Sequence, residues 1–388
     1  MIGFHNQLTK YIFFGVLSIP RGVYLTLSLI ILPVYLYDHG VSVEIVTLIV
    51  GILTLPWIIK FLFGGIIDHY SFYGRRIFVI LGGVSSSLSL FLLTFLDPSG
   101  SVLLLATLLL IGNSGLLFLD VAQAAWVIDI TKKTERGKIN GIMFGSYFLT
   151  MAICSSFLGL IAKDIGYISV FIISGIIILL TSIFTMLFNE KKKPKNIDRT
   201  AVSFNQLKKD YLHLISVFAL ISSIGGGLLV LVAPLFMRIS LDLDIASIGI
   251  LSSFFLLSRA FGSVAGGIIS DTYGRKKSLA VFIGSSIILA PFFIISKSFE
   301  AMGIIYTVFG FLLGSFHSIT STVFMDISKK ERCATHYSIY ASIFNMGRLL
   351  GEISAGLLIV TMGFSRIYLI IGWFSILTIL ILYFSRIE

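Results

Sequence analysis

The sequence predicts an all-α membrane protein with twelve transmembrane helices, arranged as two six-helix pseudo-repeats. Three observations predict it: the apolar composition, the number of long apolar runs, and motifs that recur between the two halves. Of the 388 residues, 56% are hydrophobic and 12% are charged, and the mean hydropathy is +1.00. Soluble domains average about 45–50% apolar and about 25% charged residues, so the composition excludes a water-soluble protein.

Apolar runs define the individual helices. A hydrocarbon core about 30 Å thick requires about 20 apolar residues per helical span. Such runs occur near residues 11–36, 43–67, 77–96, 101–129, 139–162, 167–188, 211–237, 245–269, 278–296, 301–326, 337–361 and 366–385. The first run continues past Arg21 to Tyr37 without a small-residue cleavage site, so we interpret it as a span and not as a signal peptide.

The distribution of Lys and Arg predicts the orientation, because positively charged loops are retained on the cytoplasmic side. The even-numbered connections and the two tails hold 21 of these residues, and the other side holds only Lys163, Arg238, Lys297 and Arg366. Both termini are therefore expected in the cytoplasm of a multi-pass cell-membrane protein. Four basic residues remain inside the spans, namely Arg21, Lys60, Arg259 and Arg348.

The longest connection divides the chain into two halves. We expect an N-terminal six-helix bundle over residues 1–188, a cytoplasmic linker over 189–210, and a C-terminal six-helix bundle over 211–388. The linker contains the run Lys191-Lys-Lys-Pro-Lys195, and a solvated charge run in contact with anionic lipid explains that run better than a ligand site does.

Two motifs occur once in each half. Gly65-Ile-Ile-Asp68, followed by Tyr73-Gly74-Arg75-Arg76, recurs as Gly267-Ile-Ile-Ser-Asp271, followed by Tyr273-Gly274-Arg275-Lys276. Asp129-Ile-Thr-Lys-Lys-Thr-Glu-Arg136 recurs with one residue deleted as Asp326-Ile-Ser-Lys-Lys-Glu-Arg332. Duplicated halves are typical of transporters that alternate access around a site at the bilayer midplane.

At these loops the chain resembles the major facilitator superfamily, whose signature joins spans 2 and 3 with a Gly-x-x-x-Asp-x-x-Gly-Arg-Arg type of motif. Within it, the sequence is similar to the branch of AmpG-like muropeptide permeases, acetyl-coenzyme A transporters and folate/biopterin transporters. That similarity rests on Leu55-Pro56-Trp57-Ile-Ile-Lys60, Leu119-Asp120-Val-Ala-Gln-Ala-Ala-Trp126 and Glu331-Arg-Cys-Ala-Thr-His336. The resemblance implies the major facilitator fold.

Ionisable residues inside the spans are the candidates for the solute site, because a charge at the bilayer centre costs about 2.5–3.5 kcal/mol and must face a partner or a water-filled cavity. Three guanidinium groups near one depth suit a carboxylate or a phosphate. Each could instead be neutralised within the protein, and a lone His317 is more often a packing residue. The predicted solute-binding residues are Arg21, Tyr24, Arg259, His317, Asn345 and Arg348.

Asp120 and Glu352 are the candidates for proton coupling. Burial in an apolar environment favours the protonated form of a carboxyl group, as a proton carrier requires. Asp120 lies on a polar face of its span with Asn113 and Gln123. Glu352 follows Arg348 by four residues, so the two share a helix face and can pair; a pair that is purely structural is the alternative.

Charged residues at the cytoplasmic helix ends predict a gate of ion pairs that form and break between two states, and the resemblance implies the same gate. Lys60, two turns inside from Asp68, can extend toward this rim; a structural role for it is favoured slightly over the alternative, which is ligand binding. Gly141/Gly145, Gly262/Gly266 and Gly347/Gly351 are spaced for close helix approach. The predicted gate residues are Asp68, Arg75, Arg76, Asp129, Arg136, Asp271, Arg275, Asp326 and Arg332.

Several functional classes find no support in the sequence. The net charge of +10 is scattered over short loops and not over one face, which argues against a nucleic-acid partner. Cys154 and Cys333 are the only cysteines, so no disulfide framework or metal site is predicted. A phosphate-binding loop, a nucleophile elbow and a zinc-protease motif do not occur. We therefore expect neither an enzyme nor a cofactor.

The sequence favours a monomeric secondary active transporter that moves a small, anionic or amphipathic organic solute, with H⁺ as the coupling ion and membrane lipid as its surroundings. A pump that exports hydrophobic drug-like compounds is the alternative within transport, since 13% of the residues are aromatic. A membrane sensor or scaffold without transport activity is the alternative from another class.

Overall fold

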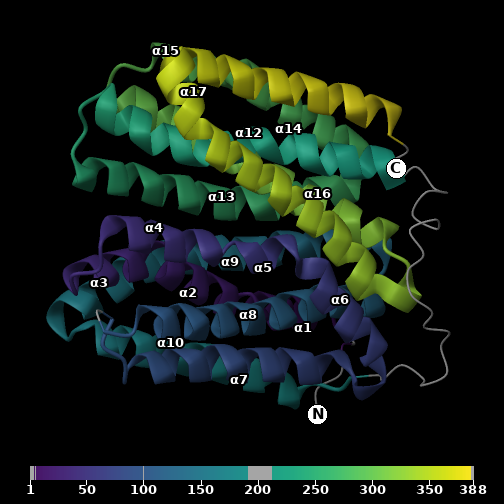
Figure 1. The fold of residues 1–388 in the computed structure, drawn as a ribbon. Helices are drawn as coiled ribbons and strands as arrows, with labels where there is room; N and C mark the ends of the chain where they lie inside the picture. Colours follow the sequence, from purple (N-terminus) through teal and green to yellow (C-terminus); the bar gives the residue numbers. More distant parts are fainter. Residues whose placement is uncertain (1–3, 5, 99, 191–211, 386–388) are drawn as a thin grey trace. The chain divides into compact units, whose positions relative to one another are not determined.

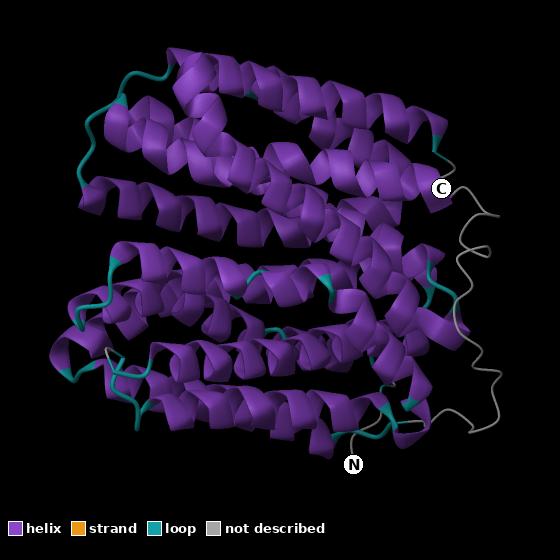
Figure 2. Cartoon of the chain, viewed as in Figure 1, coloured by secondary structure: helices purple, strands orange, loops and turns teal. Residues whose placement is uncertain are grey.

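The computed structural model describes residues 4, 6–98, 100–190 and 212–385. These residues form helices joined by short loops, and none of them forms a β-sheet (Figure 1, Figure 2). The predicted linker lies outside the described residues apart from Asn189 and Glu190.

Contacts between Cα atoms divide the chain into two compact units. Unit 1 comprises Met1–Thr131, Ser146–Ile197 and Ser328–Ser338, and unit 2 comprises Lys132–Gly145, Asp198–Ile327 and Ile339–Glu388. Each unit is therefore mainly one half of the sequence together with a short segment from the other half. Those two segments begin within the second repeated motif, shortly after Asp129 and Asp326.

Unit 1 begins with a span that changes its helical form several times. This span, Gln7–Asp38, contains α1 (Gln7–Leu17), α2 (Ile19–Thr26), the π-helical turn η1 (Leu27–Ile31) and α3 (Leu32–Asp38). The other helices of this half are α4 (Val43–Ile52), α5 (Leu55–Ile58), α6 (Lys60–His69), η2 (Ser71–Tyr73), α7 (Arg75–Leu93), α8 (Val102–Ile130), α9 (Lys133–Asp164), α10 (Tyr167–Ile183) and η3 (Phe184–Leu187).

The second half of the chain contains the remaining helices, most of which belong to unit 2. They are α12 (Leu212–Ile239), α13 (Ile245–Tyr273), α14 (Arg275–Leu289), α15 (Phe292–Ile295), α16 (Phe299–Ile327), η4 (Lys330–Arg332) and α17 (Cys333–Phe384). An apolar cluster that includes Leu229, Phe255, Phe293 and Tyr368 forms the core of this unit, and unit 1 has a separate cluster that includes Leu27, Leu109 and Phe171.

Ten helices among the described residues are long and apolar enough to cross a membrane, and a pair bent by 43°, Leu48–Ile58 with Lys60–His69, makes eleven. One of the ten is α17, whose 52 residues would extend about 78 Å at about 1.5 Å per residue, more than twice a hydrocarbon core. Gly363 interrupts it with a φ of 75° and a ψ of 166°. If the segments of α17 before and after Gly363 are counted as two spans, the total is twelve. The count of twelve spans therefore depends on how the breaks at Ile59 and Gly363 are interpreted.

The break in the second span lies beside a polar residue of α8. Pro56 stands near the start of α5, and Ile59 between α5 and α6 has a non-helical φ and ψ of −90° and 17°. Asn113 donates from Nδ2 to the carbonyl of Leu53, and its Oδ1 accepts from the Trp57 indole at 3.3 Å. A neighbouring helix therefore satisfies the backbone at the break, which is how interrupted helices are tolerated in membranes.

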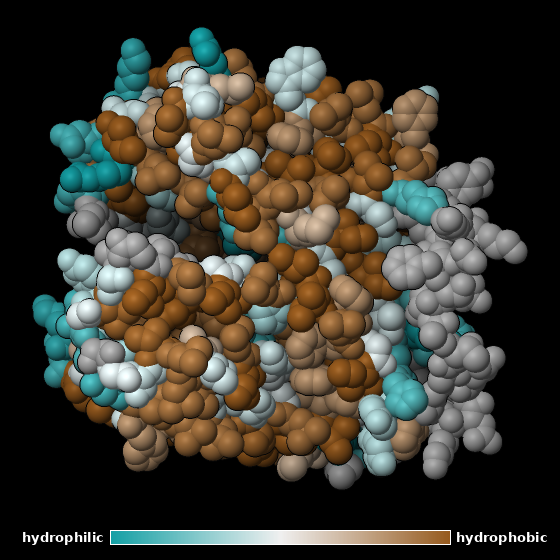
Figure 3. Space-filling model, viewed as in Figure 1, coloured by the Kyte–Doolittle hydropathy of each residue, from teal (hydrophilic) through white to brown (hydrophobic). Residues whose placement is uncertain are grey.

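Apolar side chains cover the flanks of the helices, whereas hydrophilic residues gather at the loops (Figure 3). On α7, Leu81, Leu88 and Leu92 are exposed at helical spacing on one face, and exposed apolar stripes of this kind fit contact with lipid.

Candidate functional site

A cluster of three charged groups lies inside unit 1. Asp120 on α8 pairs with Arg21 on α2, at 3.0 Å from Oδ1 to Nη1, and with Lys60, the first residue of α6, through Oδ2. The side chains of Asp120 and Lys60 are 6% and 3% exposed, and that of Arg21 is 17% exposed. Two cations and one carboxylate give this buried cluster a formal charge of +1.

Aromatic rings surround the two cations. The Trp57 ring centroid is 5.0 Å from the Arg21 guanidinium carbon and 5.5 Å from the Lys60 ammonium nitrogen. Tyr147 on α9 lies 4.5 Å from Arg21, and Tyr337 on α17 lies 5.2 Å from Lys60. Cation–π contacts stabilise charge where water is scarce, so the cations are held in place by groups that do not neutralise them.

The two cations follow breaks in their spans. Ser18 ends α1 and Pro20 stands near the start of α2, directly before Arg21. Lys60 follows the break at Ile59. Interrupted helices line the binding sites of many transporters, and here they direct both cations toward one residue of α8.

The other predicted polar residues of unit 1 form hydrogen bonds with neighbouring helices. Gln123 donates from Nε2 to the Phe14 carbonyl and to Ser18 Oγ, both at 2.9 Å. Tyr24 is fully buried, packs in the apolar cluster and donates from its hydroxyl to the Leu109 carbonyl at 2.8 Å. The Tyr24 hydroxyl is therefore engaged in the core of unit 1 and is not part of the cluster around Asp120.

Unit 2 holds two further pairs of predicted residues. The Arg259 Nη2 atom on α13 lies 3.3 Å from His317 Nδ1 on α16. Rings of Phe144 and Phe344 flank the imidazole at centroid distances of 4.6 and 5.2 Å, so His317 combines a polar contact with aromatic packing.

Arg348 and Glu352 form the i, i+4 pair that their spacing allows. The Nε to Oε1 distance is 2.7 Å, and the two side chains are 41% and 25% exposed. Asn345 lies one turn earlier on α17 and is partly exposed. Unlike Asp120, this carboxylate is accessible.

Three of the predicted gate residues of unit 1, Asp68, Arg75 and Asp129, form one network. Arg75, at the start of α7, lies 3.2 Å from Asp68 and 3.0 Å from Asp129. Asp68 also accepts from the backbone N–H groups of Ala334 and Thr335, at 3.3 and 2.7 Å. A carboxylate at these N–H groups stabilises the first turn of α17 through the helix dipole.

Unit 2 repeats this arrangement. Arg275 pairs with Asp271 at 2.5 Å and with Asp326 at 3.0 Å, and Arg136 reaches Asp326 at 3.1 Å. Asp271 accepts from the N–H groups of Gly137 and Lys138, at 3.0 and 2.7 Å, in the first turns of α9.

The two networks differ at one position. The residue before the capped N–H groups is Arg136 in unit 2 and Cys333 in unit 1. The Cys333 thiol contacts Arg75 Nη2 at 3.2 Å and Asp129 Oδ1 at 3.5 Å. The sequence repeat aligned Arg136 with Arg332 instead, because a one-residue deletion does not show which residue begins the helix.

Arg76 takes a different role from its neighbour Arg75. Its guanidinium donates to the Phe188 carbonyl, and its backbone N–H donates to Glu190 at 3.1 Å. Glu190 also accepts from the backbone N–H of Arg75. Burial raises the pKa of Glu190 although these N–H donors and both arginines favour its charged form.

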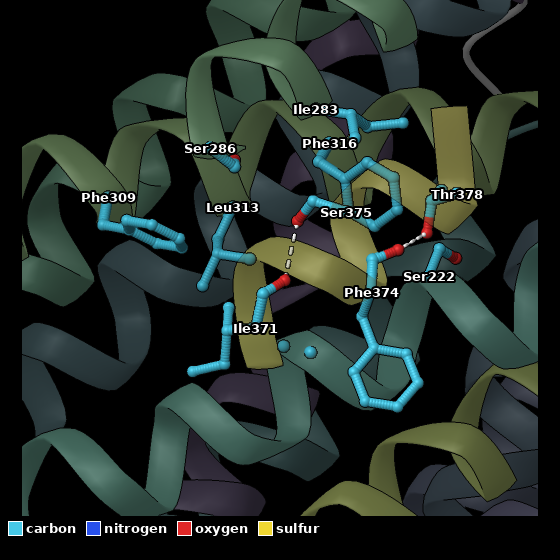
Figure 4. A pocket seen from close by; sticks show the side chains of 12 residues that line it. Ser222, Ile283, Ser286, Phe309, Leu313, Phe316, Ile371, Phe374, Ser375 and Thr378 are labelled. Atoms are coloured by element: carbon cyan, nitrogen blue, oxygen red, sulfur yellow. Dashed lines mark hydrogen bonds between the residues drawn. The ribbon is translucent and has the colours of Figure 1, made fainter. Parts of the chain in front are cut away.

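A small cavity of about 40 Å³ lies in unit 2 between α12, α14, α16 and α17 (Figure 4). Its hydroxyl groups are bonded within their own helices, as Ser375 to the Ile371 carbonyl and Thr378 to the Phe374 carbonyl. None of the predicted site residues lines it. Across the described ranges, no group of three His, Cys, Asp or Glu side chains could hold a metal.

Sequence reasoning missed several contributors to these clusters. Lys60 is 2% exposed and pairs with Asp120 instead of extending toward Asp68. Its signal in the sequence was a single cation deep in an apolar run, three residues after Trp57. For Tyr147, Tyr337, Cys333 and Glu190 the sequence carries no comparable signal, since their partners lie more than 90 residues away.

Comparison with known proteins agrees with this fold. The profile of the Major Facilitator Superfamily matches residues 12–219 and 214–388. A putative transporter AmpG 1 of Rickettsia bellii is 23% identical over 386 residues, covering 90% of this chain and 91% of the relative. An uncharacterized MFS-type transporter of Methanocaldococcus jannaschii, MJ1560, is 22% identical over 334 residues, covering 81% and 82% of the two chains.

Solved structures share the fold over nearly the whole chain. The fucose:proton symporter FucP of E. coli superposes with a TM-score of 0.80 at 12% identity and covers 98% of this chain and 99% of its own. The human organic anion transporter MFSD10 superposes with a TM-score of 0.77 at 13% identity, covering 97% and 100%. With helices, repeated loop networks and profile in agreement, the chain belongs to the major facilitator superfamily and is a multi-pass membrane transporter of small molecules.

Proposed function

We propose that this transporter moves a small organic anion together with a proton, and that the solute competes with Asp120 for Arg21 and Lys60. The single observation that carries this proposal is the buried cluster of two cations around one carboxylate. Its excess positive charge favours an anion, and guanidinium and ammonium groups both bind carboxylates and phosphates.

The competition links the solute to the proton. When the anion takes the two cations, Asp120 is left buried without its partners. Burial favours the protonated form of a carboxyl group, so Asp120 binds a proton as the anion binds. A solute with one negative charge and one proton then enter together, and the charge of the site is unchanged by loading.

Unit 2 supplies the second set of proposed contacts. Arg259 with His317 and Arg348 with Glu352 are paired within that unit, and we propose that both arginines meet the solute together with Asn345. Glu352 would then exchange Arg348 for a proton, as Asp120 does for its cations. Tyr24 is left out of the proposed site because its hydroxyl is held by Leu109.

The networks around Asp68 and Asp271 are proposed as the cytoplasmic gate. They bias the equilibrium between conformations through contacts that exist in only one of them, and they do not select the solute. We propose that the termini and the linker lie on this cytoplasmic side too, as the distribution of Lys and Arg predicts.

Two structural neighbours support the class of reaction. FucP is by its title a proton symporter and MFSD10 an organic anion transporter. At 12% and 13% identity these neighbours share only the fold with this chain. The proposal that the solute is an anion therefore depends on the charged cluster of this chain itself.

The test is uptake into proteoliposomes under an imposed pH gradient, with a metabolite extract as the probe and mass spectrometry as the readout. We expect accumulation of an anionic compound, and a loss of about tenfold or more in Asp120→Asn, equivalent to about 1.4 kcal/mol or more. Exchange of the same compound without a gradient should persist. Asp242→Asn is the control, because its side chain is 98% exposed.

Three outcomes would overturn parts of this proposal. If gradient-driven accumulation survives in both Asp120→Asn and Glu352→Gln, these two residues are not the proton-coupling groups. Thermal stabilisation by cationic, drug-like compounds and not by anionic ones would favour export of hydrophobic compounds. Absence of any uptake would favour the membrane sensor or scaffold.

A further inference from the structure

The first turns of α17 contact both the gate network and the buried charged cluster of unit 1. Asp68 binds the N–H groups of Ala334 and Thr335 and, at 2.8 Å, the Thr335 hydroxyl. Two residues later the Tyr337 ring lies 5.2 Å from the Lys60 ammonium. Tyr337 is 5% exposed, so this contact is shielded from water, where cation–π interactions are strongest.

The helices α6 and α17 are in close contact beside these groups. A Cβ on Gly64 would lie 2.6 Å from the Ala334 carbonyl oxygen and would overlap the Ser338 hydroxyl, whereas a Cβ on Gly65 would meet nothing within 4 Å. Gly64 therefore allows backbone to approach backbone. If the first turns of α17 leave Asp68, Tyr337 must leave Lys60 as well.

Lys60 is shared between three partners on different elements. Its ammonium contacts Asp120 on α8, the Trp57 ring on α5 and the Tyr337 ring on α17. The remaining charged and titratable groups of the cluster are Arg21 and Tyr147. Asp68, Arg75 and Asp129 face the same turns of α17 from the gate, and Cys333 and His336 belong to those turns.

We propose that Tyr337 is a positioning residue that couples the gate at Asp68 to the charge state of Asp120. When Asp120 is protonated it releases Lys60, and the ammonium then depends more on the Tyr337 ring, which favours the docked first turns of α17. When Asp120 is ionised it holds Lys60, and undocking costs less. By linkage, docking of α17 changes proton binding at Asp120 by the same factor.

This inference rests on the proposed function only in treating Asp120 as the group that gains and loses a proton. It does not depend on which solute is carried. A readout of the gate that needs no solute can therefore test it.

Cys333 provides that readout, because it is fully buried between Arg75 and Asp129 when α17 is docked. In a Cys154→Ala background it is the one thiol of the chain. We would measure the rate of its alkylation by N-ethylmaleimide in full-length protein in liposomes over a range of pH, corrected for the reactivity of a free thiol. Undocking exposes Cys333, so the corrected rate should rise with pH as Asp120 ionises.

The variants separate a role of the ring from a general loss of structure. Tyr337→Leu should raise the rate at low pH by about three- to tenfold, as expected for the loss of a buried cation–π contact, and should abolish its pH dependence. Tyr337→Phe keeps the ring and should behave like the parent protein. With Asp120→Asn, the corrected labelling rate of Cys333 should not change with pH.

Two matched controls complete the experiment. Tyr340→Leu removes another buried tyrosine of α17, whose ring stacks on Phe324 at 5.6 Å, and should keep the pH dependence. Gly64→Ala should expose Cys333 at every pH, whereas Gly65→Ala should not, so the coupling can be tested even if Tyr337→Leu fails to fold.

The inference fails if Tyr337→Leu keeps the full pH dependence, if Tyr337→Phe behaves like Tyr337→Leu, or if the labelling rate does not respond to Asp120→Asn. These results are distinct from failure of the proposed function. Labelling that follows Asp120 and Tyr337 without any proton-driven uptake would overturn the proposed transport and leave this inference standing.

Discussion

Asp120 holds its position through two cations, so the three residues do not contribute equally to stability. Removing one partner of a buried ion pair leaves an uncompensated charge, whereas removing a cation from a cluster with excess positive charge leaves a balanced pair. The residues proposed to bind the solute therefore also contribute to the stability of the fold.

We predict that Asp120→Asn destabilises the protein by about 3–5 kcal/mol, while Lys60→Met costs much less because Arg21 and Asp120 stay paired. Thermal unfolding in detergent micelles should rank the two variants in this order. Lys163→Met, at an exposed position, is the control. An equal or larger loss in Lys60→Met would mean that the ammonium, and not the carboxylate, holds the cluster together.

Glu190 links the end of η3 to the start of α7, and burial raises its pKa. A raised pKa in the folded state means that the folded protein binds the proton more tightly than the unfolded chain. The stabilisation is therefore complete below the unfolded value and is lost as the pH rises through the folded value.

Glu190→Gln should consequently flatten the dependence of the melting temperature on pH on the alkaline side of pH 4.5, the ordinary value for this side chain. The parent protein should lose stability relative to the variant as the pH rises through this window. Asp242→Asn, at a side chain that is 98% exposed, should leave the profile unchanged. Parallel profiles for the parent and Glu190→Gln would show that Glu190 does not titrate in this range.

At the scale of elements, breaks in the helices decide where the functional side chains lie. Proline residues and a π-helical turn interrupt the first span, and Pro56 with Ile59 interrupts the second. In unit 2 the corresponding helices α12 and α13 run without such interruptions, apart from Pro234 within α12.

The turns that precede α7 and α14 allow a matched test of glycine. Gly74 and Gly274 have φ values of 99° and 90° with ψ values of 161° and 155°, a region open essentially only to glycine, where another residue costs about 1–3 kcal/mol. A Cβ on Gly74 would also lie 2.5 Å from Glu190 Oε2, whereas one on Gly274 would meet nothing within 4 Å.

Gly74→Ala should therefore lower the melting temperature more than Gly274→Ala does. Adding Glu190→Ala should remove the excess, because it removes the atoms that clash. Equal losses in the two single variants would show that Glu190 moves aside at little cost.

At the scale of the whole molecule, the distribution of basic residues predicts which loops face the cytoplasm. Lys132 precedes α9 on the predicted cytoplasmic side, and Asp242 lies in the loop between α12 and α13 on the other side; both are exposed. In a cysteine-free background, Asp242→Cys should react with an impermeant maleimide in intact cells. Lys132→Cys should react only after the membrane is opened. The reverse pattern would invert the topology and place both termini outside.

The sequence by itself determined the class of the molecule. Composition excluded a soluble protein, and hydropathy located the membrane helices, including the boundary near Gly363 between residues 361 and 366. Repeated loops indicated two related halves and the family. These features are local, because each depends on the apolar content or the spacing of neighbouring residues.

Tertiary structure alone decided which charges meet. Lys60 pairs with Asp120 and not with Asp68. The Tyr24 hydroxyl bonds the Leu109 carbonyl in the core. Cys333, and not Arg332, directly precedes the N–H groups that Asp68 caps. Ion pairs between residues 60 or 99 positions apart, as in the Asp120 cluster, depend on helix breaks and on which helices pack together. Periodicity within one helix carries no information about either, so the sequence could name the charged residues but not their partners.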